Sequence, residues 1–228
     1  MFFNVLKTIA RRASMALHLP VEHVSAVSAA VNLLRQGHVI ALPTDTVYGL
    51  ACSAVDVSAI NSLFQLKARN ENKPVAICVG KVSDVRRWAI VDHLPDGLLA
   101  SLLPGPVTLV LTCADKLDKS LSLRNKVGVR IPDKPFLIDV CNELNFPLAL
   151  TSANVSSEPS SVRIEEFVTL WDKLGGVFDG GPLGVGDSNR SASTVIDLSD
   201  PGVFEITRKG IAEEHSKRIL KKYGLKSL

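Results

Sequence analysis

The chain has 228 residues, and 26 lysines and arginines stand against 23 aspartates and glutamates, which gives a formal net charge of +3 at pH 7. Hydrophobic residues make up 46% and charged residues 21%, a composition that excludes a disordered chain and allows a sizeable core. The charge is too small to indicate a nucleic-acid partner by itself. No apolar stretch approaches the roughly 20 residues of a membrane-spanning helix.

The cysteines exclude two classes of site. Cys52, Cys78, Cys113 and Cys141 lie far apart and form no C-x-x-C pair, so neither a zinc site nor a redox dithiol is expected. Free thiols within apolar runs are typical of a reducing compartment.

Residues 1–20 differ from the rest. They contain Lys7, Arg11 and Arg12 but no acidic residue, and their apolar residues fit one face of a helix. This pattern is typical of a mitochondrial transit segment, although a short basic tail explains it equally well. We therefore expect a cytoplasmic protein with a mitochondrial form if residues 1–20 act as a transit segment, Met15 being a second start. Residues 21–228 are expected to form one domain.

Helical and strand-type patterns alternate along the rest of the chain. The expected helices cover residues 22–36, a segment capped by Ser58 that ends near 67–69, a short segment capped by Ser83, and residues 98–103, 136–144, 165–174 and 211–223. The expected strands cover residues 38–42, 75–79, 107–112, 127–131, 148–151, 175–179, 193–198 and 203–207. This alternation predicts a single α/β domain with a largely buried sheet. Residues 180–192, rich in Gly, Ser and Asn, are the longest stretch without a predicted element and a candidate lid.

Polar clusters follow the apolar strands. They are Thr44-Asp45-Thr46, Lys67-x-Arg69 with Lys73, Arg130, residues 151–154, Ser193-Thr194 and Arg208. Each cluster alone is explained by a turn, a helix cap or an exposed charge. Together, at strand and helix ends of an α/β chain, they indicate a site for an anionic ligand, since arginine and lysine bind phosphate and carboxylate.

Three common kinds of site are absent from these clusters. The chain has neither the P-loop pattern nor the G-x-G-x-x-G fingerprint, so a bound nucleotide must be held by side chains and short turns. None of the five histidines lies in a cluster, which argues against a Ser-His-Asp or Cys-His hydrolase.

The clusters resemble the motifs of the YrdC-domain family, whose animal members are threonylcarbamoyl-AMP synthases. The matching segments are residues 43–50, Lys67-x-Arg69-x-x-x-Lys73-Pro74, and residues 104–108, 129–132, 151–154, 193–195 and 208–210. They occur in order from about residue 24 to residue 210. The resemblance implies a twisted mixed parallel and antiparallel sheet flanked by helices. It also implies synthesis of threonylcarbamoyl-AMP and pyrophosphate from L-threonine, bicarbonate and ATP, for transfer by a separate complex to the tRNA adenosine beside the anticodon.

The resemblance also assigns residues. Lys67 and Arg69, as catalytic groups, and Lys73 would surround the ATP phosphates, whereas Ser152, Asn154, Ser160 and Arg208 would line the nucleotide side. Thr44, Arg130, Ser193 and Cys78 would face threonine. Some relatives have histidine at the position of Cys78 and asparagine at that of Lys73. No protein metal site is expected, and Mg²⁺ would come with ATP, held mainly by substrate oxygens.

Two alternatives remain. One is a non-catalytic module that binds double-stranded RNA or tRNA through its basic face, which an aromatic content of only 5% makes less favourable. Weak tRNA binding is also compatible with the enzyme. The other is the carbamoyl-transferring domain of hydrogenase maturation proteins. Those proteins carry an acylphosphatase-like domain and C-x-x-C zinc motifs, and this chain has neither.

Overall fold

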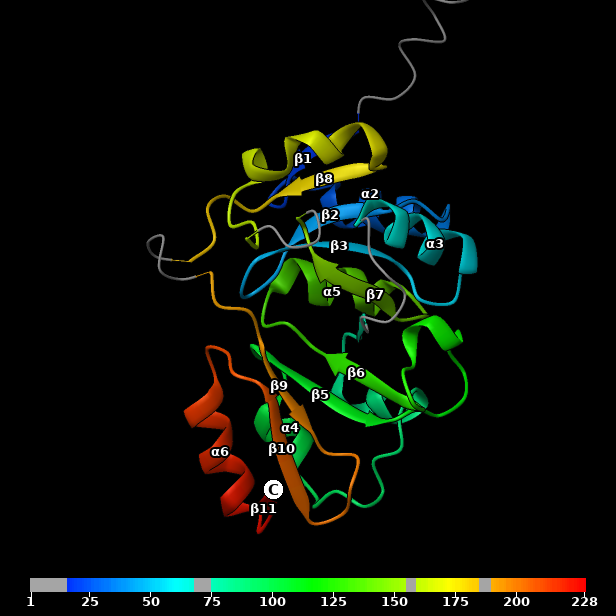
Figure 1. Cartoon of the computed structure of the whole chain (residues 1–228). Coiled ribbons are helices and arrows are strands. Elements are labelled where there is room, and N and C mark those ends of the chain that lie inside the picture. The colour runs from blue at the N-terminus through cyan, green and yellow to red at the C-terminus, as the bar shows by residue number, and fades with distance from the viewer. Residues whose placement is uncertain (1–15, 68–74, 155–158, 185–189) are drawn as a thin grey trace, which may run out of the picture.

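The computed structural model describes residues 16–67, 75–154, 159–184 and 190–228. Eleven strands form one mixed sheet in the order β1-β8-β2-β3-β7-β4-β6-β5-β9-β10-β11 (Figure 1). The pairs β1–β8, β2–β8, β4–β6, β5–β9 and β10–β11 are parallel, and the other neighbours are antiparallel. The expected mixed sheet flanked by helices is confirmed.

Most elements follow the predicted alternation, but the strands at residues 17–20, 48–53 and 226–227 were not predicted. The strands are β1 (Leu17–Pro20), β2 (Ile40–Pro43), β3 (Tyr48–Ser53), β4 (Ala76–Cys78), β5 (Val107–Thr112), β6 (Lys126–Arg130), β7 (Leu148–Ser152), β8 (Gly176–Asp179), β9 (Thr194–Asp197), β10 (Val203–Arg208) and β11 (Lys226–Ser227). The α-helices are α2 (Ala26–Arg35), α3 (Val57–Leu66), α4 (Leu98–Leu102), α5 (Pro135–Glu143) and α6 (Glu213–Lys222). Three 3₁₀ segments, η1 (Val82–Arg87), η2 (Lys119–Leu121) and η3 (Ile164–Lys173), complete the described part.

Three local expectations require correction. Asp56, not Ser58, caps α3, because its carboxylate accepts hydrogen bonds from the amides of Ser58 and Ala59. The short helix expected after Ser83 is a 3₁₀ segment that follows Lys81 and has no side-chain cap. The amphipathic segment at 165–174 is also 3₁₀ and is kinked at Phe167.

Strand β1 places the edge of the domain earlier than residue 21. Leu17–Pro20 pairs in parallel with β8, so the last residues of the expected transit segment belong to the sheet. Residues 1–15, including Met15, lie outside the described residues, and the transit segment stays a prediction. Within the described ranges, no helix is both long and apolar enough to cross a bilayer.

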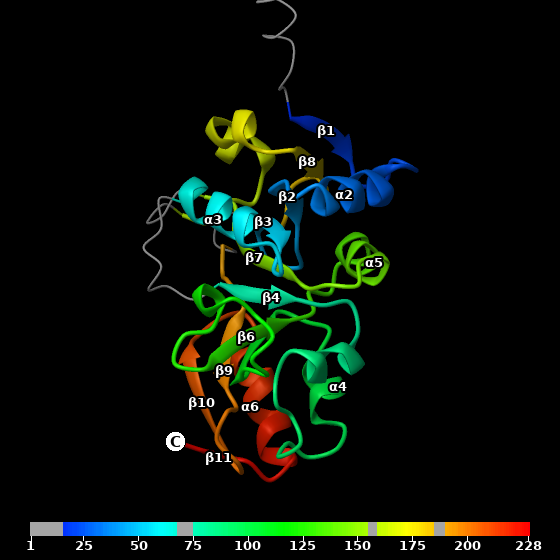
Figure 2. The same ribbon diagram turned by 90° about the vertical axis from the view of Figure 1, so that its right-hand side faces the viewer.

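Two apolar clusters hold the helices against the sheet. In one, α2 and α5 pack together over side chains of β2, β4, β7 and β8. In the larger one, α3, α4 and α6 pack against the other side chains of these strands and against β5 and β9. Figure 2 shows α3 and α5 on opposite sides of β3 and β7. Beyond β7, alternate side chains of β5, β6 and β9 line a cavity, and the site lies there.

Candidate active site

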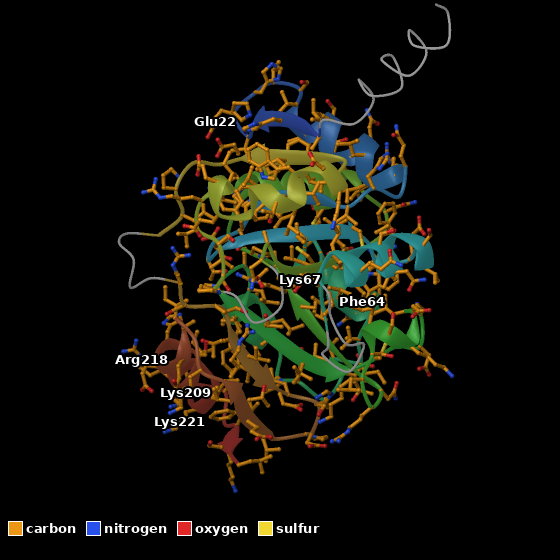
Figure 3. The ribbon with its side chains drawn as sticks, turned by 45° about the horizontal axis from the view of Figure 1, so that its top comes forward. Glu22, Phe64, Lys67, Lys209, Arg218 and Lys221 are labelled. Carbon is orange, nitrogen blue, oxygen red and sulfur yellow. The ribbon has the colours of Figure 1, made fainter. Side chains whose placement is uncertain are left out.

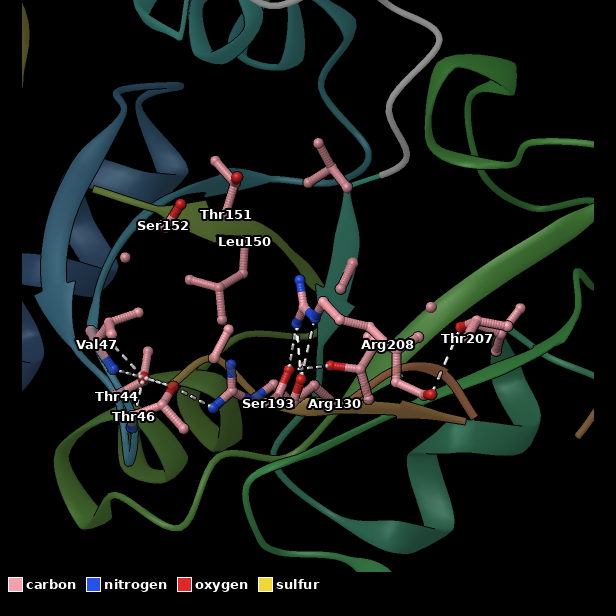
Figure 4. Close-up of a pocket in the computed structure, with 18 of the residues that line it drawn as sticks. Thr44, Thr46, Val47, Arg130, Leu150, Thr151, Ser152, Ser193, Thr207 and Arg208 are labelled. Atoms are coloured by element: carbon pink, nitrogen blue, oxygen red, sulfur yellow. Dashed lines mark hydrogen bonds between the residues drawn. The ribbon is translucent and has the colours of Figure 1, made fainter. Parts of the chain in front are cut away.

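A cavity of about 560 Å³ lies over one face of β5, β6 and β9 (Figure 4), a size typical of small-molecule sites. Its lining comes from the β2–β3 turn, from β4 to β7 and from β9 to β10. Among the described residues that line it, Arg124, Lys126, Arg130 and Arg208 are basic and only Asp197 is acidic. The cavity therefore favours an anionic ligand.

The turn between β2 and β3 is built on Thr44. Its hydroxyl accepts hydrogen bonds from the amides of Thr46 and Val47, at 3.1 and 3.2 Å, and donates to the carbonyl of Val47 at 2.7 Å. Only 3% of Thr44 is exposed. The Thr44 side chain lines the cavity as predicted, but these bonds use its hydroxyl to fix the turn.

Asp45 and Thr46, to which the sequence analysis assigned no role, hold Arg130. The Arg130 Nη2 atom donates to the Asp45 carboxylate and, at 2.8 Å, to Thr46 Oγ1. Asp45 also accepts a hydrogen bond from the amide of Asp133 at 3.0 Å. The Arg130 and Asp45 side chains are each only 9% exposed, so the β2–β3 turn and the end of β6 are joined by a buried ion pair.

The Arg130 guanidinium has one buried donor without a partner among the described residues. Its Nε is buried and makes no hydrogen bond there, although Arg130 lines the cavity. An unpaired buried donor is costly. A ligand carboxylate in the cavity would satisfy it.

A second polar group lies where β9 and β10 meet the cavity. The Arg208 guanidinium donates to the Ser193 carbonyl at 2.9 and 3.1 Å and to the Ser193 hydroxyl at 2.9 Å. That hydroxyl lies 2.8 Å from Thr108 Oγ1. The structure therefore brings Ser193 and Arg208 into direct contact, although the sequence assigned them to opposite sides of the site.

Lys67 is a buried cation at the end of α3 (Figure 3). Only 3% of it is exposed, and its ammonium donates to the carbonyls of Ser152 and Asn154 and to Asn154 Oδ1, with Ser152 Oγ at 3.4 Å. It thereby fixes the segment after β7. Lys67 and Asn154 are not among the lining residues, whereas Ser152 and Ser160 are.

Of the remaining assigned residues, only Cys78 is described, and its side chain does not line the cavity. Cys78 is fully buried, and its Sγ lies 3.7 Å from Sγ of Cys141 on α5. Ala76, two residues earlier on the same strand face, lines the cavity instead, because α5 covers the far end of β4. The predicted threonine contact at Cys78 is thus wrong for its side chain in this structure. Arg69 and Lys73 lie outside the described residues, and their roles stay predictions.

Sequence reasoning missed the pair Lys126–Asp197. Lys126 Nζ lies 2.8 Å from Asp197 Oδ2 across β6 and β9. Burial alone would raise the pKa of Asp197, but hydrogen bonds from Lys126 and Ser199 hold it below its ordinary value. The period-two spacing from Arg130 back to Lys126 is the pattern that points to Lys126.

A mixed α/β sheet with a largely basic cavity over one face of β5, β6 and β9 defines the class of protein. The chain belongs to the Sua5/YciO/YrdC family, whose sequence model, described as "Telomere recombination", matches residues 32–210.

The relatives are more specific. The bovine threonylcarbamoyl-AMP synthase is 51% identical over 203 residues, which cover 88% of this chain and 73% of that protein. The human threonylcarbamoyl-AMP synthase is 51% identical over 204 residues, with the same two shares. A crystal structure of P. abyssi Sua5 complexed with L-threonine matches with a TM-score of 0.80 and 26% identity, covering 94% of this chain and 63% of that one.

Proposed function

We propose that this protein is a threonylcarbamoyl-AMP synthase that makes its product from L-threonine, bicarbonate and ATP. The observation that carries the proposal is Arg130, a buried cation at the cavity whose Nε has no partner among the described residues. The 51% identity to animal synthases and the fold shared with a threonine-bound Sua5 support it.

The reaction needs positioning more than covalent help. The threonine amine attacks bicarbonate, and loss of water leaves a carbamate. A carbamate oxygen then attacks the α-phosphorus of ATP, and the bond from that phosphorus to the bridging oxygen of pyrophosphate breaks. Holding the two anions together and neutralising charge in a site closed to water lowers the barrier.

On the threonine side, the unpartnered Nε of Arg130 would donate to the carboxylate. The guanidinium is already fixed by Asp45 and Thr46, so little side-chain entropy is lost when the substrate binds. Thr44 supports this side by holding the turn, and Ser193 lies across the cavity. The preorganised donor is the feature that suits catalysis.

On the nucleotide side, Ser152, Ser160 and Arg208 line the cavity, and Arg69 and Lys73 are proposed to complete the phosphate site. Lys67 would act by holding the carbonyl groups after β7. This arrangement would surround the phosphates with hydroxyl and guanidinium donors, and no histidine is among the described lining residues.

Mg²⁺ would enter with ATP and neutralise charge on its phosphates. In the described part of the chain, no group of three or more His, Cys, Asp or Glu side chains forms a metal site. Asp197, the acidic residue among the described lining residues, forms an ion pair with Lys126. These residues fit an ion held by substrate oxygens and water.

The proposed product goes to a tRNA threonylcarbamoyl transferase complex, and the proposed locations are the cytoplasm and, through residues 1–20, mitochondria. Imaging of the tagged full-length chain tests the second location, and complete absence from mitochondria would refute it. The RNA-binding alternative is not favoured. The exposed basic residues Arg218 and Lys221 lie on α6, with Lys209 nearby, away from Lys67 (Figure 3), as expected for a solvated helix face.

Labelled bicarbonate tests the function. Purified protein with ATP, Mg²⁺ and L-threonine should incorporate the label into an AMP adduct, and other amino acids should give much less. Absence of the adduct, together with tight tRNA binding, would overturn the proposal in favour of the RNA module.

A further inference from the structure

The chain leaves β8 and reaches β9 through residues 180–193, and both described parts of this connection are fastened to one short segment, residues 160–162. On the β8 side, the Leu183 amide donates to the Val162 carbonyl at 2.8 Å. On the β9 side, Arg190 Nη1 donates to the Ser160 carbonyl at 2.9 Å. Ser160 itself lines the cavity, so the fastening lies directly behind the site.

Arg190 also makes a two-pronged ion pair with Glu166. Its Nη1 and Nη2 atoms lie 2.7 and 3.0 Å from the two carboxylate oxygens. The hydrogen bonds from Arg190 hold the pKa of Glu166 below its ordinary value. Glu166 Oε2 in turn accepts the Val162 amide at 3.1 Å. Two parallel hydrogen bonds fix the plane of the guanidinium as well as its position.

The segment that receives these bonds is rigid on its inner side. Ser161 Oγ donates to the Ala153 carbonyl at 2.7 Å, and the Tyr48 amide donates to the Ser161 carbonyl at 2.8 Å. Tyr48 begins β3, and Ala153 follows β7. Residues 160–162 therefore belong to the half of the sheet that carries Thr44 and Ser152.

Arg190 lies just before the part of the site that is formed by β9 and β10, opposite the half that carries Thr44 and Ser152. Ala192 and Ser193 line the cavity two and three residues later, and Ser193 holds Arg208 at the start of β9. The Arg190 side chain thus ties the segment that presents Ser193 and Arg208 to the segment that presents Ser160. These two groups face the cavity from different strands.

We infer that Arg190, held by Glu166, is a positioning residue that sets the spacing between the Ser160 side and the Ser193–Arg208 side of the substrate cavity. This role rests on the proposed function. Neither Arg190 nor Glu166 is itself a lining residue, although Arg190 holds the backbone carbonyl of Ser160, which is one. Its removal should displace cavity groups without deleting any of them, and misplacement on the scale of an ångström is costly in an enzyme site.

The test compares Arg190→Gln, Glu166→Gln and the double variant in the labelled-bicarbonate assay. Arg190→Gln should raise the KM for ATP roughly tenfold and change kcat by less than about threefold. The double variant should be no worse than Arg190→Gln, since the two residues act as one unit. Arg190→Lys keeps the positive charge but loses the two-pronged contact with Glu166, so its KM for ATP should lie between those of wild type and Arg190→Gln.

The matched control is Lys217→Gln, which breaks the ion pair of Lys217 with Glu213 on α6 (2.6 Å) and should leave both parameters unchanged. Hydrogen exchange at the Val162 amide gives a readout independent of turnover and should become faster in Glu166→Gln. An unchanged KM in Arg190→Gln, or a fall in kcat alone that parallels lost folded protein, would overturn the positioning role. A wild-type protein that makes no adduct would instead overturn the proposed function, and with it this role.

Discussion

The buried ion pair between Arg130 and Asp45 makes Asp45→Asn the most informative substitution. Asparagine keeps an oxygen that can accept from Arg130, but it removes the negative charge beside a guanidinium that is only 9% exposed. It also removes the second carboxylate oxygen, which accepts the Asp133 amide. The variant therefore leaves a buried cation without its countercharge.

The expected loss of unfolding free energy follows from the burial of this ion pair. Removing one partner of a buried ion pair costs about 3–5 kcal/mol, and the oxygen that asparagine retains places this case near the lower limit, about 3 kcal/mol. In a domain of this size such a loss lowers Tm by roughly 6–12 °C. Because the carboxylate of L-threonine would supply the missing charge, threonine should stabilise the variant more than it stabilises the wild type.

Urea unfolding and thermal shifts with and without L-threonine measure both effects. Asp139→Asn is the matched control, because Asp139 is exposed on α5 and has no hydrogen bond or ion pair recorded among the described residues. It should change stability by less than about 0.5 kcal/mol. A loss below about 1 kcal/mol in Asp45→Asn, or equal stabilisation of both proteins by threonine, would refute the reasoning.

Four further outcomes are expected. Gly210→Ala should cost about 3 kcal/mol, because a Cβ would lie 2.4 Å from the backbone nitrogen of Thr194; normal urea stability would contradict this. Lys67→Met should lower the free energy of unfolding by about 3 kcal/mol, because it removes the buried ammonium that donates to the carbonyls of Ser152 and Asn154; an unaltered unfolding midpoint would argue against it. Cys52 should resist iodoacetamide at pH 8 until urea is added, since burial raises its pKa to about 12; mass spectrometry of the native protein checks this. The pKa of Glu166 is lowered in the folded protein, so its contribution to the free energy of unfolding should be complete above about pH 4.3. That contribution should be lost as the pH falls through the folded-state pKa. Urea unfolding of wild type and Glu166→Gln at several pH values tests the direction of this change.

The sequence was most reliable where a strand is buried on one face or ends at a polar residue. Strand β5 has the predicted bounds, Val107–Thr112. Strand β3 was missed, because Tyr48–Ser53 is buried on both faces and shows no alternation. The polar residues 44–46, which directly precede β3, indicated a site, and the apolar segment after them was therefore not assigned as a strand.

The chemistry of the site was predictable, but its pairings were not. Asp45 and Arg130 are 85 positions apart, and they meet because β4 pairs with β6 while β3 pairs with β7. No local pattern encodes that register. The same limit explains Cys78, since alternation places it on the face of Ala76 but does not show that α5 covers it.

The described cationic side chains at the site differ in the kind of partner that holds them. Lys67 donates to carbonyl, amide and hydroxyl oxygens and holds backbone, whereas Arg208 is bound to Ser193, whose oxygens carry no formal charge. The carboxylates of Asp197 and Asp45 pair with Lys126 and Arg130. Arg208, held by Ser193, brings a guanidinium to one side of the cavity, while Arg130, held by Asp45 and Thr46, contributes a directed donor on another. A site with two guanidinium groups held on separate strands suits two anionic groups, and under the proposed function these are the threonine carboxylate and the ATP phosphates.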